Sequence, residues 1–390
     1  MLYNLLDALR DGLIDNNLYR FVMVFDQVQF RAIFAALLAF GIVVGFGKPV
    51  IRWLTAKKIG DAGLTDAAAL EQAAASKKNT PTMGGILIAG AIAASTLLLA
   101  DLGNRYVQMA LIAIVWLAVL GGVDDWLKLT ASSRPGGSRQ GLHAWEKLVF
   151  QFGLAFLLGW FTFNLGETDA PRDLAHVLNI PFQKTYDAAG LGPSDGLIYL
   201  GRAGFIVFTI LMISGMSNAV NITDGMDGLA SGMSTAVGLG LLVLCLIAGE
   251  RLAAHYLLMP HIPGTAELGV VAGALTGACL GFLWWNCAPA SVFMGDTGAL
   301  CIGGLIGYLA VAIRQEALVL LISGVMLLEI GSVALQVAYF KATGGKRIFR
   351  CAPFHWHLHM GGWSEQKIVA RFWIVTVVLL ALAMATIKLR

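Results

Sequence analysis

Long apolar segments separated by short polar connections make up most of this chain. Ten of these segments are long enough, or nearly so, to cross a bilayer as a helix, which takes about 20 residues. Within lipid, only helices and closed barrels satisfy every backbone polar group. The pattern therefore predicts an all-α integral membrane protein with about ten transmembrane helices, centred on residues 30–47, 84–100, 106–123, 146–164, 203–220, 229–248, 268–286, 298–313, 317–340 and 371–388.

The composition favours a membrane protein over a soluble one. Hydrophobic residues make up 57% of the 390 positions and charged residues only 13%, with a mean hydropathy of +0.74. A soluble domain carries roughly twice that charged fraction. The net charge of +3 is too small to indicate a nucleic-acid partner. The five cysteines are scattered and contain no C-x-x-C pair, so they do not predict a disulfide framework.

The segment before the first span is too polar to be a signal peptide. Asp7, Asp11 and Asp15 interrupt any apolar run there. We expect residues 1–29 to form an external or interfacial lead-in. No internal repeat or low-complexity linker divides the rest, so residues 30–390 are expected to form a single polytopic membrane domain.

The distribution of Lys and Arg gives the predicted orientation. The odd-numbered connections between spans carry a clear excess of basic over acidic residues, whereas the other side is slightly acidic. Basic loops stay in the cytoplasm, so the odd-numbered connections are predicted to be cytoplasmic. The acidic connection 165–202, rich in Pro and Gly, then lies on the external side, where we expect an ordered, hairpin-like loop.

Five polar motifs interrupt the apolar pattern, and all five fall on the predicted cytoplasmic side. They are KKNTPTMGG (77–85), GGVDD (121–125), NITDGMDG (221–228), FMGD (293–296) and PFHWHLH (353–359). Motifs that share one membrane face can meet although they are far apart in the chain. Their shared face predicts one active site at the bilayer surface, where a membrane lipid and a soluble compound can both react.

Carboxylates dominate these motifs. Asp124 and Asp125 are neighbours at the end of the third span, and Asp296 stands just before the eighth. Adjacent carboxylates repel each other unless a cation or a proton lies beside them. Such pairs bind Mg²⁺ that carries a diphosphate, or act as a base. Alone, an acidic pair is more often a polar helix end, and a single Asp is a plain N-cap. Their combination favours a catalytic site.

The NITDGMDG motif joins the fifth and sixth spans and offers groups that suit a ligand. Asn221 can both donate and accept hydrogen bonds, and Asp224 and Asp227 would share a face if the stretch were helical. A tight polar turn is the alternative. Asn286 and Phe293, before the eighth span, add an amide and an aromatic ring that can stack on a base.

Cationic and imidazole groups complete the set. Lys77 can neutralise phosphate as a point charge, besides serving as a positive-inside determinant, and Thr82 adds a hydroxyl group. The stretch lacks the spacing of a Walker A loop. His355 and His357 suit proton donation or phosphate contact. A zinc site that includes Cys351 is the less favoured alternative.

Glu329 stands apart from these motifs, inside the ninth span. An unpaired carboxylate in lipid is costly. We therefore expect this side chain to line a cavity or a helix contact.

Carboxylates, lysines and histidines without a nucleophilic Ser or Cys constellation point to phosphoryl-group chemistry on a diphosphate. The motifs also resemble those of a known family. TPTMGG, GGVDDWLK, NAVNITDGMDGLASG, NCAPASVFMGDTGAL and PFHWHLHMGGWSEQKIVARFW are similar, in order and spacing, to motifs of the phospho-N-acetylmuramoyl-pentapeptide-transferases, the MraY-type translocases. These belong to the polyprenyl-phosphate N-acetylhexosamine-1-phosphate transferases. The wider group tends to have Arg after its first Pro, where this chain has Thr82, which favours the muramyl-pentapeptide branch.

The resemblance implies a homodimer of ten-helix protomers in the bacterial cytoplasmic membrane, with the active site facing the cytoplasm. It implies transfer of phospho-MurNAc-pentapeptide from UDP-MurNAc-pentapeptide to undecaprenyl phosphate, which gives lipid I and UMP with Mg²⁺ in peptidoglycan biosynthesis. It assigns catalytic roles to Asp124, Asp125, Asp296, His355 and His357, with Asp296 a direct Mg²⁺ ligand, and substrate-binding roles to Lys77, Thr82, Asn221, Asp224, Asp227, Asn286 and Phe293.

The chain departs from the family in the histidine motif. Three consecutive His are usual there, whereas Trp356 separates His355 from His357 in this sequence, and His359 stands where an acid is usual.

Two other functions fit part of the pattern. One is a related enzyme that takes UDP-GlcNAc as donor. The other is a transporter, although transporters place charged groups near the midplane and often show repeats.

Overall fold

Helices account for nearly all regular structure in the described part of the chain, which comprises residues 1–57, 80–130, 141–166, 173–187 and 192–388 of this computed structural model. Within it, nine helices are long and apolar enough to cross a membrane, and α5 (Gly85–Leu99) is a shorter apolar helix. The prediction of an all-α polytopic membrane protein is confirmed. The nine are α3 (Val28–Ala56), α6 (Arg105–Leu129), α7 (Ala144–Phe163), α8 (Arg202–Thr223), α9 (Leu229–Gly249), α11 (Leu268–Asn286), α12 (Gly295–Ala312), α14 (Gly324–Ala342) and α16 (Glu365–Lys388).

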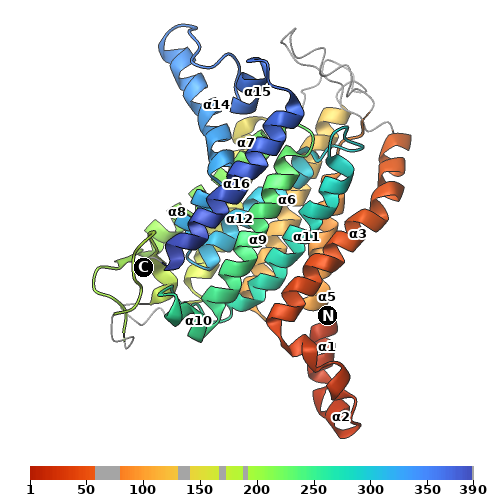
Figure 1. The fold of residues 1–390 in the computed structure, drawn as a ribbon, viewed down its shortest axis with the longest axis vertical. Helices are drawn as coiled ribbons and strands as arrows, with labels where there is room; N and C mark the ends of the chain where they lie inside the picture. Colours follow the sequence, from red (N-terminus) through yellow and green to blue (C-terminus); the bar gives the residue numbers. More distant parts are fainter. Residues whose placement is uncertain (58–79, 131–140, 167–172, 188–191, 389–390) are drawn as a thin grey trace.

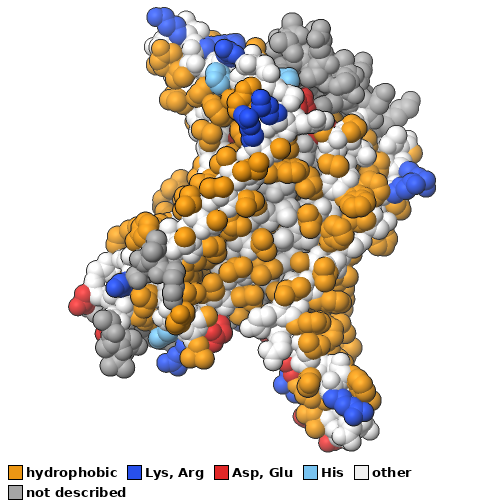
Figure 2. Space-filling model, in the orientation of Figure 1, with side chains coloured by type: hydrophobic (Ala, Val, Ile, Leu, Met, Phe, Trp, Pro, Cys, Tyr) orange, Lys and Arg blue, Asp and Glu red, His pale blue; other side chains and the backbone are white. Residues whose placement is uncertain are grey.

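The long helices lie side by side in one inclined bundle (Figure 1). The short helix α15 (Phe354–His359) lies at one end, and α1 (Leu2–Ala8), α2 (Arg10–Asp15) and α10 (Arg251–Tyr256) lie at the other. Hydrophobic side chains cover the middle of the face shown in Figure 2, whereas its charged side chains lie toward the two ends. Such a belt is typical of a bundle whose middle faces lipid.

Two predicted spans differ from the observed helices in ways that matter for the site. The third was predicted to end at residue 123, but α6 continues to Leu129 and carries the whole GGVDD motif. A helix keeps its backbone hydrogen bonds beyond the apolar stretch that reveals it, so the lipid boundary does not end it. The ninth, predicted over 317–340, is divided at Ser323 into α13 (Glu316–Ile322) and α14, whose first residue is Gly324. Glycine weakens a helix at such a point.

The connection expected to form a periplasmic hairpin contains two short strands. β1 (Val177–Leu178) and β2 (Ile198–Tyr199) pair antiparallel. The Nε group of Arg314 donates to the Val177 carbonyl at 2.8 Å and fixes the base of this hairpin to the bundle. Single 3₁₀ turns complete the described elements, namely η1 (Tyr19–Phe21), η2 (Met23–Asp26), η4 (Leu174–His176) and η5 (Thr265–Glu267).

The central helix of the bundle is α12, all but the first residue of which is buried. Two glycines allow it to approach α8 closely. A Cβ atom on Gly303 would lie 2.3 Å from the Met216 carbonyl oxygen, and one on Gly307 would lie 2.6 Å from that of Met212. Helices in lipid associate through such small residues, because no hydrophobic effect drives them together. The acidic start of α12 is thereby placed inside one end of the bundle.

Helix α11 packs on α3 through glycines one turn apart. A Cβ atom on Gly273 would lie 2.1 Å from the Ala32 carbonyl oxygen, and one on Gly277 would lie 1.8 Å from that of Ala36. Real Cβ atoms essentially never come within 3.0 Å of another heavy atom. Any side chain at Gly277 therefore has to push the two helices apart.

We expect Gly277→Leu to lower the melting temperature of the detergent-purified protein, because overpacking costs about 1–3 kcal/mol. Gly45→Leu on α3 is the matched control, since nothing lies within 4 Å of a Cβ atom at Gly45. Equal melting temperatures for the two variants would contradict this packing.

Candidate active site

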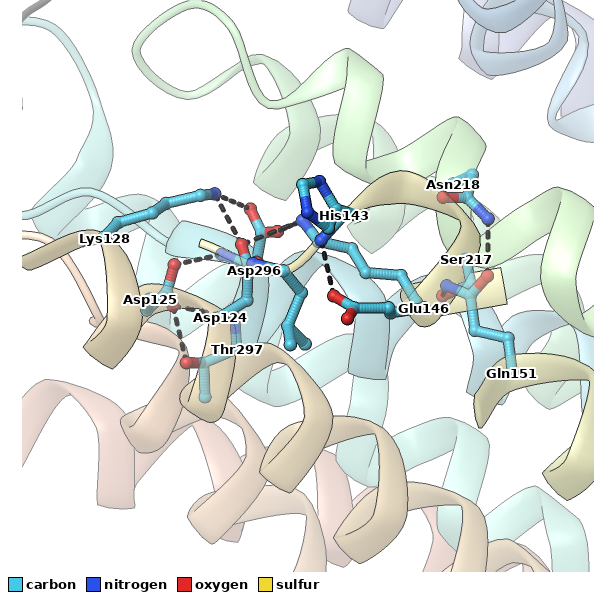
Figure 3. A network of polar contacts seen from close by, with 12 residues as sticks. Asp124, Asp125, Lys128, His143, Glu146, Gln151, Ser217, Asn218, Asp296 and Thr297 are labelled. Atoms are coloured by element: carbon cyan, nitrogen blue, oxygen red, sulfur yellow. Dashed lines mark hydrogen bonds and ion pairs between the residues drawn. The ribbon is translucent and has the colours of Figure 1, made fainter. Parts of the chain in front are cut away.

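Three carboxylates from two helices meet at one end of the bundle. Asp124 and Asp125 lie near the end of α6, and Asp296 lies in the first turn of α12. All three are buried, and each offers an oxygen atom within 4.8 Å of the others. Figure 3 shows the three side chains close together, with Lys128 reaching over them. The GGVDD and FMGD motifs, far apart in the chain, thus form one cluster.

Glycines allow the helices to meet at this level. A Cβ atom on Gly121, one turn before the acidic pair, would lie 2.2 Å from the Asp296 carbonyl oxygen. A Cβ atom on Gly85 would lie 2.0 Å from the backbone nitrogen of Gly298. Helices α5 and α6 therefore contact the start of α12 backbone to backbone, and this contact brings the carboxylates together.

Asp125 binds the first turn of α12 directly. Its Oδ1 atom accepts from the backbone N–H of Asp296 at 3.0 Å, and its Oδ2 atom accepts from the N–H and the hydroxyl group of Thr297 at 2.9 and 2.6 Å. The first N–H groups of a helix have no partner within the helix, and Asp125 supplies one from α6. The sequence alone would suggest that Asp296 caps the start of α12. Asp125 fills that role instead, so the Asp296 carboxylate is left for other contacts.

Two lysines bridge Asp124 and Asp296. The Nζ atom of Lys128 lies 2.7 Å from Asp124 and 3.1 Å from Asp296, and that of Lys147, on α7, lies 2.8 Å and 2.6 Å from the same two residues. The backbone N–H of Leu142 also donates to Asp124 at 2.7 Å. Two ammonium groups against three carboxylates leave the cluster with a formal negative charge.

Sequence reasoning missed both lysines as site residues. It counted Lys128 and Lys147 only as basic residues of cytoplasmic loops. One signal was present, because Lys128 stands four residues after Asp124 on a continuous helix, where opposite charges face each other. No comparable signal marks Lys147, whose contact with Asp296 joins residues 149 positions apart.

The cluster suits a hard divalent cation. Its donor atoms are carboxylate oxygens, the ligands that Mg²⁺ prefers, and its charge is not fully neutralised by the lysines. Asp124 and Asp296 direct oxygen atoms toward the bridging ammonium groups, which a bound cation can replace, whereas both oxygens of Asp125 bind the backbone and hydroxyl groups at the start of α12. The geometry thus separates the acidic pair into an anchoring residue, Asp125, and a ligand candidate, Asp124.

The first three residues of the NITDGMDG motif end α8, and the rest form a turn before α9, so its two acids lie outside a helix and have different partners. Asp227 accepts from the backbone N–H of Ala290 at 3.0 Å. Asn286 accepts from the N–H of Gly228 at 3.1 Å and donates to the Val292 carbonyl at 2.9 Å. Asp227 and Asn286 therefore tie this turn to the segment that precedes α12.

Asp224, the other acid of the turn, interacts electrostatically with the carboxylate cluster. Burial, followed by the negative charges of Asp296 and Asp125, raises the pKa of Asp224 to about 7. A carboxyl group with such a pKa changes its charge in the physiological range. The negative charge beside the cluster therefore depends on pH.

The histidine motif forms α15, and its imidazole groups have separate partners. His355 is fully buried, with its Nδ1 atom 3.0 Å from the carboxylate of Glu329. His357 accepts from the backbone N–H of Arg350 at 3.2 Å, and the ring of His359 contacts the carbonyl of Trp363. Among the described residues, the group that could hold a metal ion is the Asp cluster. The geometry does not support the alternative of a zinc site.

Of the two substrate-binding residues predicted in the KKNTPTMGG motif, the structure describes Thr82. Lys77 lies outside the described residues. The hydroxyl group of Thr82 lies beside Gly295, where a Cβ atom would be 3.1 Å from it and 2.6 Å from Asp125. The backbone of Phe293 pairs with this segment, donating to the Pro81 carbonyl at 2.8 Å, and its ring is half-buried.

A cavity of about 510 Å³ opens beside the cluster, between α7, α8 and α14. Gln151 lies beside it and is held by Ser217 and Asn218 at 3.1 and 2.7 Å (Figure 3). One wall is apolar, and Lys147 marks the end nearest the carboxylates. Its lining comprises Leu142, Ala144, Lys147, Leu148, Phe152, Ser214, Gly215, Asn218, Asn221 and Ile330.

The motifs of this site also match known family models. Residues 77–88 match Phospho-N-acetylmuramoyl-pentapeptide-transferase signature 1. This signature includes TPTMGG and indicates a phospho-MurNAc-pentapeptide transferase that forms lipid I, as the resemblance implied. Residues 107–314, more than half of the chain, match Glycosyl transferase family 4, and this region contains all three Asp residues of the cluster. The chain therefore belongs to glycosyl transferase family 4.

Proposed function

We propose that the carboxylate cluster carries out a Mg²⁺-dependent transfer of phospho-MurNAc-pentapeptide from UDP-MurNAc-pentapeptide to undecaprenyl phosphate. The observation that carries this proposal is the buried group of Asp124, Asp125 and Asp296, bridged by two lysines at the mouth of a cavity. A site that removes UMP from a sugar nucleotide must bind a diphosphate, and carboxylates with lysines supply the cation site and the positive charge for it.

Asp124 and Asp296 would hold the Mg²⁺ ion. When bound, the ion would neutralise charge on the donor diphosphate and on the leaving phosphate oxygen. Asp125 fixes the start of α12 and thereby the direction in which Asp296 points. Lys128 and Lys147 each have three N–H donors, so either can contact a phosphate oxygen while keeping a carboxylate partner.

The cavity beside Lys147 suits the acceptor lipid. Leu148, Phe152 and Ile330 give it apolar walls for an isoprenoid chain, and Lys147 can bind the phosphate group at its end. There the phosphate would also lie near Asp124, which shares the Lys147 ammonium and can position the attacking oxygen. Each oxygen of Asp124 and Asp125 already accepts from a donor, which favours direct in-line attack over a phospho-aspartate intermediate.

The donor would enter from the side of the NITDGMDG turn. Asp224 lies near the cluster, Phe293 offers a half-buried ring for the uracil base, and Thr82 adds a hydroxyl group beside Asp125. Asp227 and Asn286 hold this turn in place, so we assign them positioning roles. Asn221 faces the acceptor cavity. Lys77 is assigned to the donor phosphates.

The setting of the enzyme completes the proposal. We propose a homodimer in a bacterial cytoplasmic membrane, with residues 30–390 as one membrane domain and residues 1–29 as a periplasmic lead-in. The cluster would face the cytoplasm, because its end of the bundle carries Lys346, Arg347 and Arg350 on the α14–α15 connection.

Offering purified protein two donors tests the function. With undecaprenyl phosphate, we expect UMP and a lipid-linked product from UDP-MurNAc-pentapeptide and little from UDP-GlcNAc, with EDTA stopping the reaction and Mg²⁺ restoring it. Product formation mainly from UDP-GlcNAc, or solute uptake by proteoliposomes without lipid product, would contradict the proposal.

Removing a carboxylate charge from the cluster should stop turnover without unfolding the protein. We expect Asp124→Asn and Asp296→Asn to lower kcat at least about a hundredfold, the scale on which lost electrostatic stabilisation acts. Their melting temperatures should stay near that of the parent protein. Asp195→Asn, in the external loop, is the control. Near-normal turnover of either cluster variant would refute the assignment.

The raised pKa of Asp224 predicts how Mg²⁺ affinity depends on pH. Asp224 is mostly protonated below pH 7 and negatively charged above it, so Mg²⁺ affinity should rise between pH 6 and 8. A gain of roughly tenfold corresponds to one pKa unit of coupling. Isothermal titration calorimetry at the two pH values measures it, and Asp224→Asn should flatten the dependence. An Asp224→Asn variant that keeps the full pH dependence would show that another group is responsible.

A further inference from the structure

Glu329 is a carboxylate inside a helix bundle, and His355 is its partner. Both side chains are fully buried. The carboxylate of Glu329 accepts from the backbone N–H of His355 at 3.1 Å and lies 3.0 Å from its Nδ1 atom. The expected helix contact is thus observed, between α14 and α15, and the pair compensates a charge that would otherwise be costly to bury.

The contact fixes which imidazole nitrogen remains for a ligand. An ionised carboxylate can only accept, so the Nδ1 atom of His355 carries the proton that points to Glu329. The backbone hydrogen bond to the same carboxylate holds the start of α15, and therefore the ring, in one orientation. The Nε2 atom is directed away from Glu329.

That Nε2 atom lies against the donor-side turn. A Cβ atom on Gly225 would lie 2.4 Å from it, so only glycine permits this contact. Nε2 is buried and has no hydrogen-bond partner among the described residues. A buried polar atom without a hydrogen-bond partner destabilises the folded protein. Gly225 directly follows Asp224, whose carboxyl group senses Asp125 and Asp296, so Nε2 lies on the donor side of the cluster.

The other two imidazoles of the motif do not share this arrangement. His357 packs between Phe354 and Phe349, with ring centroids 5.6 and 5.5 Å away, and receives the N–H of Arg350. His359 contacts the carbonyl of Trp363 and the ring of Trp356. These contacts hold the loop together, and they leave His355 as the imidazole with an unused nitrogen at the donor-side turn.

We propose that Glu329 is a positioning residue for phosphoglycosyl transfer, which holds His355 so that its Nε2 atom, when it also carries a proton, donates a hydrogen bond to a phosphate oxygen of the sugar-nucleotide donor beside Gly225. This inference rests on the proposed function of the cluster. A bound diphosphate would give Nε2 the partner that it lacks. Glu329 itself touches neither substrate.

A double-mutant cycle tests the coupling. We expect Glu329→Ala and His355→Ala each to lower kcat with UDP-MurNAc-pentapeptide about tenfold or more, while the KM for undecaprenyl phosphate changes little. In the His355→Ala background, Glu329→Ala should have no further effect, because Glu329 acts through the imidazole. Glu329→Gln should retain more activity than Glu329→Ala, since its amide oxygen still accepts from Nδ1.

Two controls distinguish the positioning of His355 from a purely structural role of Glu329 in folding. Ser332→Ala removes a buried hydroxyl one turn along α14, whose partner is the backbone of Glu329, and should leave kcat near the parent value. Glu329→Gln keeps the size of the side chain and serves in the cycle if Glu329→Ala does not fold. Equal losses from the Glu329 change in the presence and absence of His355 would overturn the inference. Failure of the parent protein to form lipid I would instead overturn the proposed function.

Discussion

Bringing three carboxylates within 4.8 Å of one another in a buried site is the constraint on which the rest of this structure depends. Like charges at that distance repel, and burial increases the cost. The protein meets this cost with glycine contacts that force α6 against α12, with N–H groups of α12 that bind Asp125, and with two lysines that bridge the other two acids. The compensation is incomplete, and the remaining negative charge makes the cluster attractive to a divalent cation, which in turn can bind a diphosphate.

The bundle explains why such a site can exist at a membrane surface. Helix α12 is buried along its length, so its first turn is held from several sides. The acidic residues of α6 lie one turn beyond Gly121, on a part of the helix that continues past the apolar stretch. The cavity lined by Phe152 and Ile330 reaches Lys147, which contacts both Asp124 and Asp296. Under the proposed function, a lipid phosphate in this cavity and a soluble nucleotide would meet at the same carboxylates.

The helices and the meeting of the acidic motifs could be predicted from the sequence, because hydropathy and charge show which segments cross the membrane and on which side each connection lies. The long apolar segments predicted the helices, and the shared face of the motifs predicted that Asp124, Asp125 and Asp296 would meet. Side-chain pairings could not be predicted in the same way. The contact of Lys147 with Asp296, and that of Glu329 with His355, join residues on different helices. The turn at Asp224 and Asp227 and the interruption at Ser323 depend on local backbone geometry that an apolar pattern does not encode.

The location of a bound cation tests the central claim most directly. Anomalous diffraction from crystals grown with Mn²⁺ in place of Mg²⁺ would locate the ion without relying on activity. The account predicts a single strong peak in contact with carboxylate oxygens of Asp296 and Asp124, with the lysine ammonium groups displaced from at least one of them. A cluster without a peak at saturating Mn²⁺, or a peak held by the histidines of α15 instead, would contradict it.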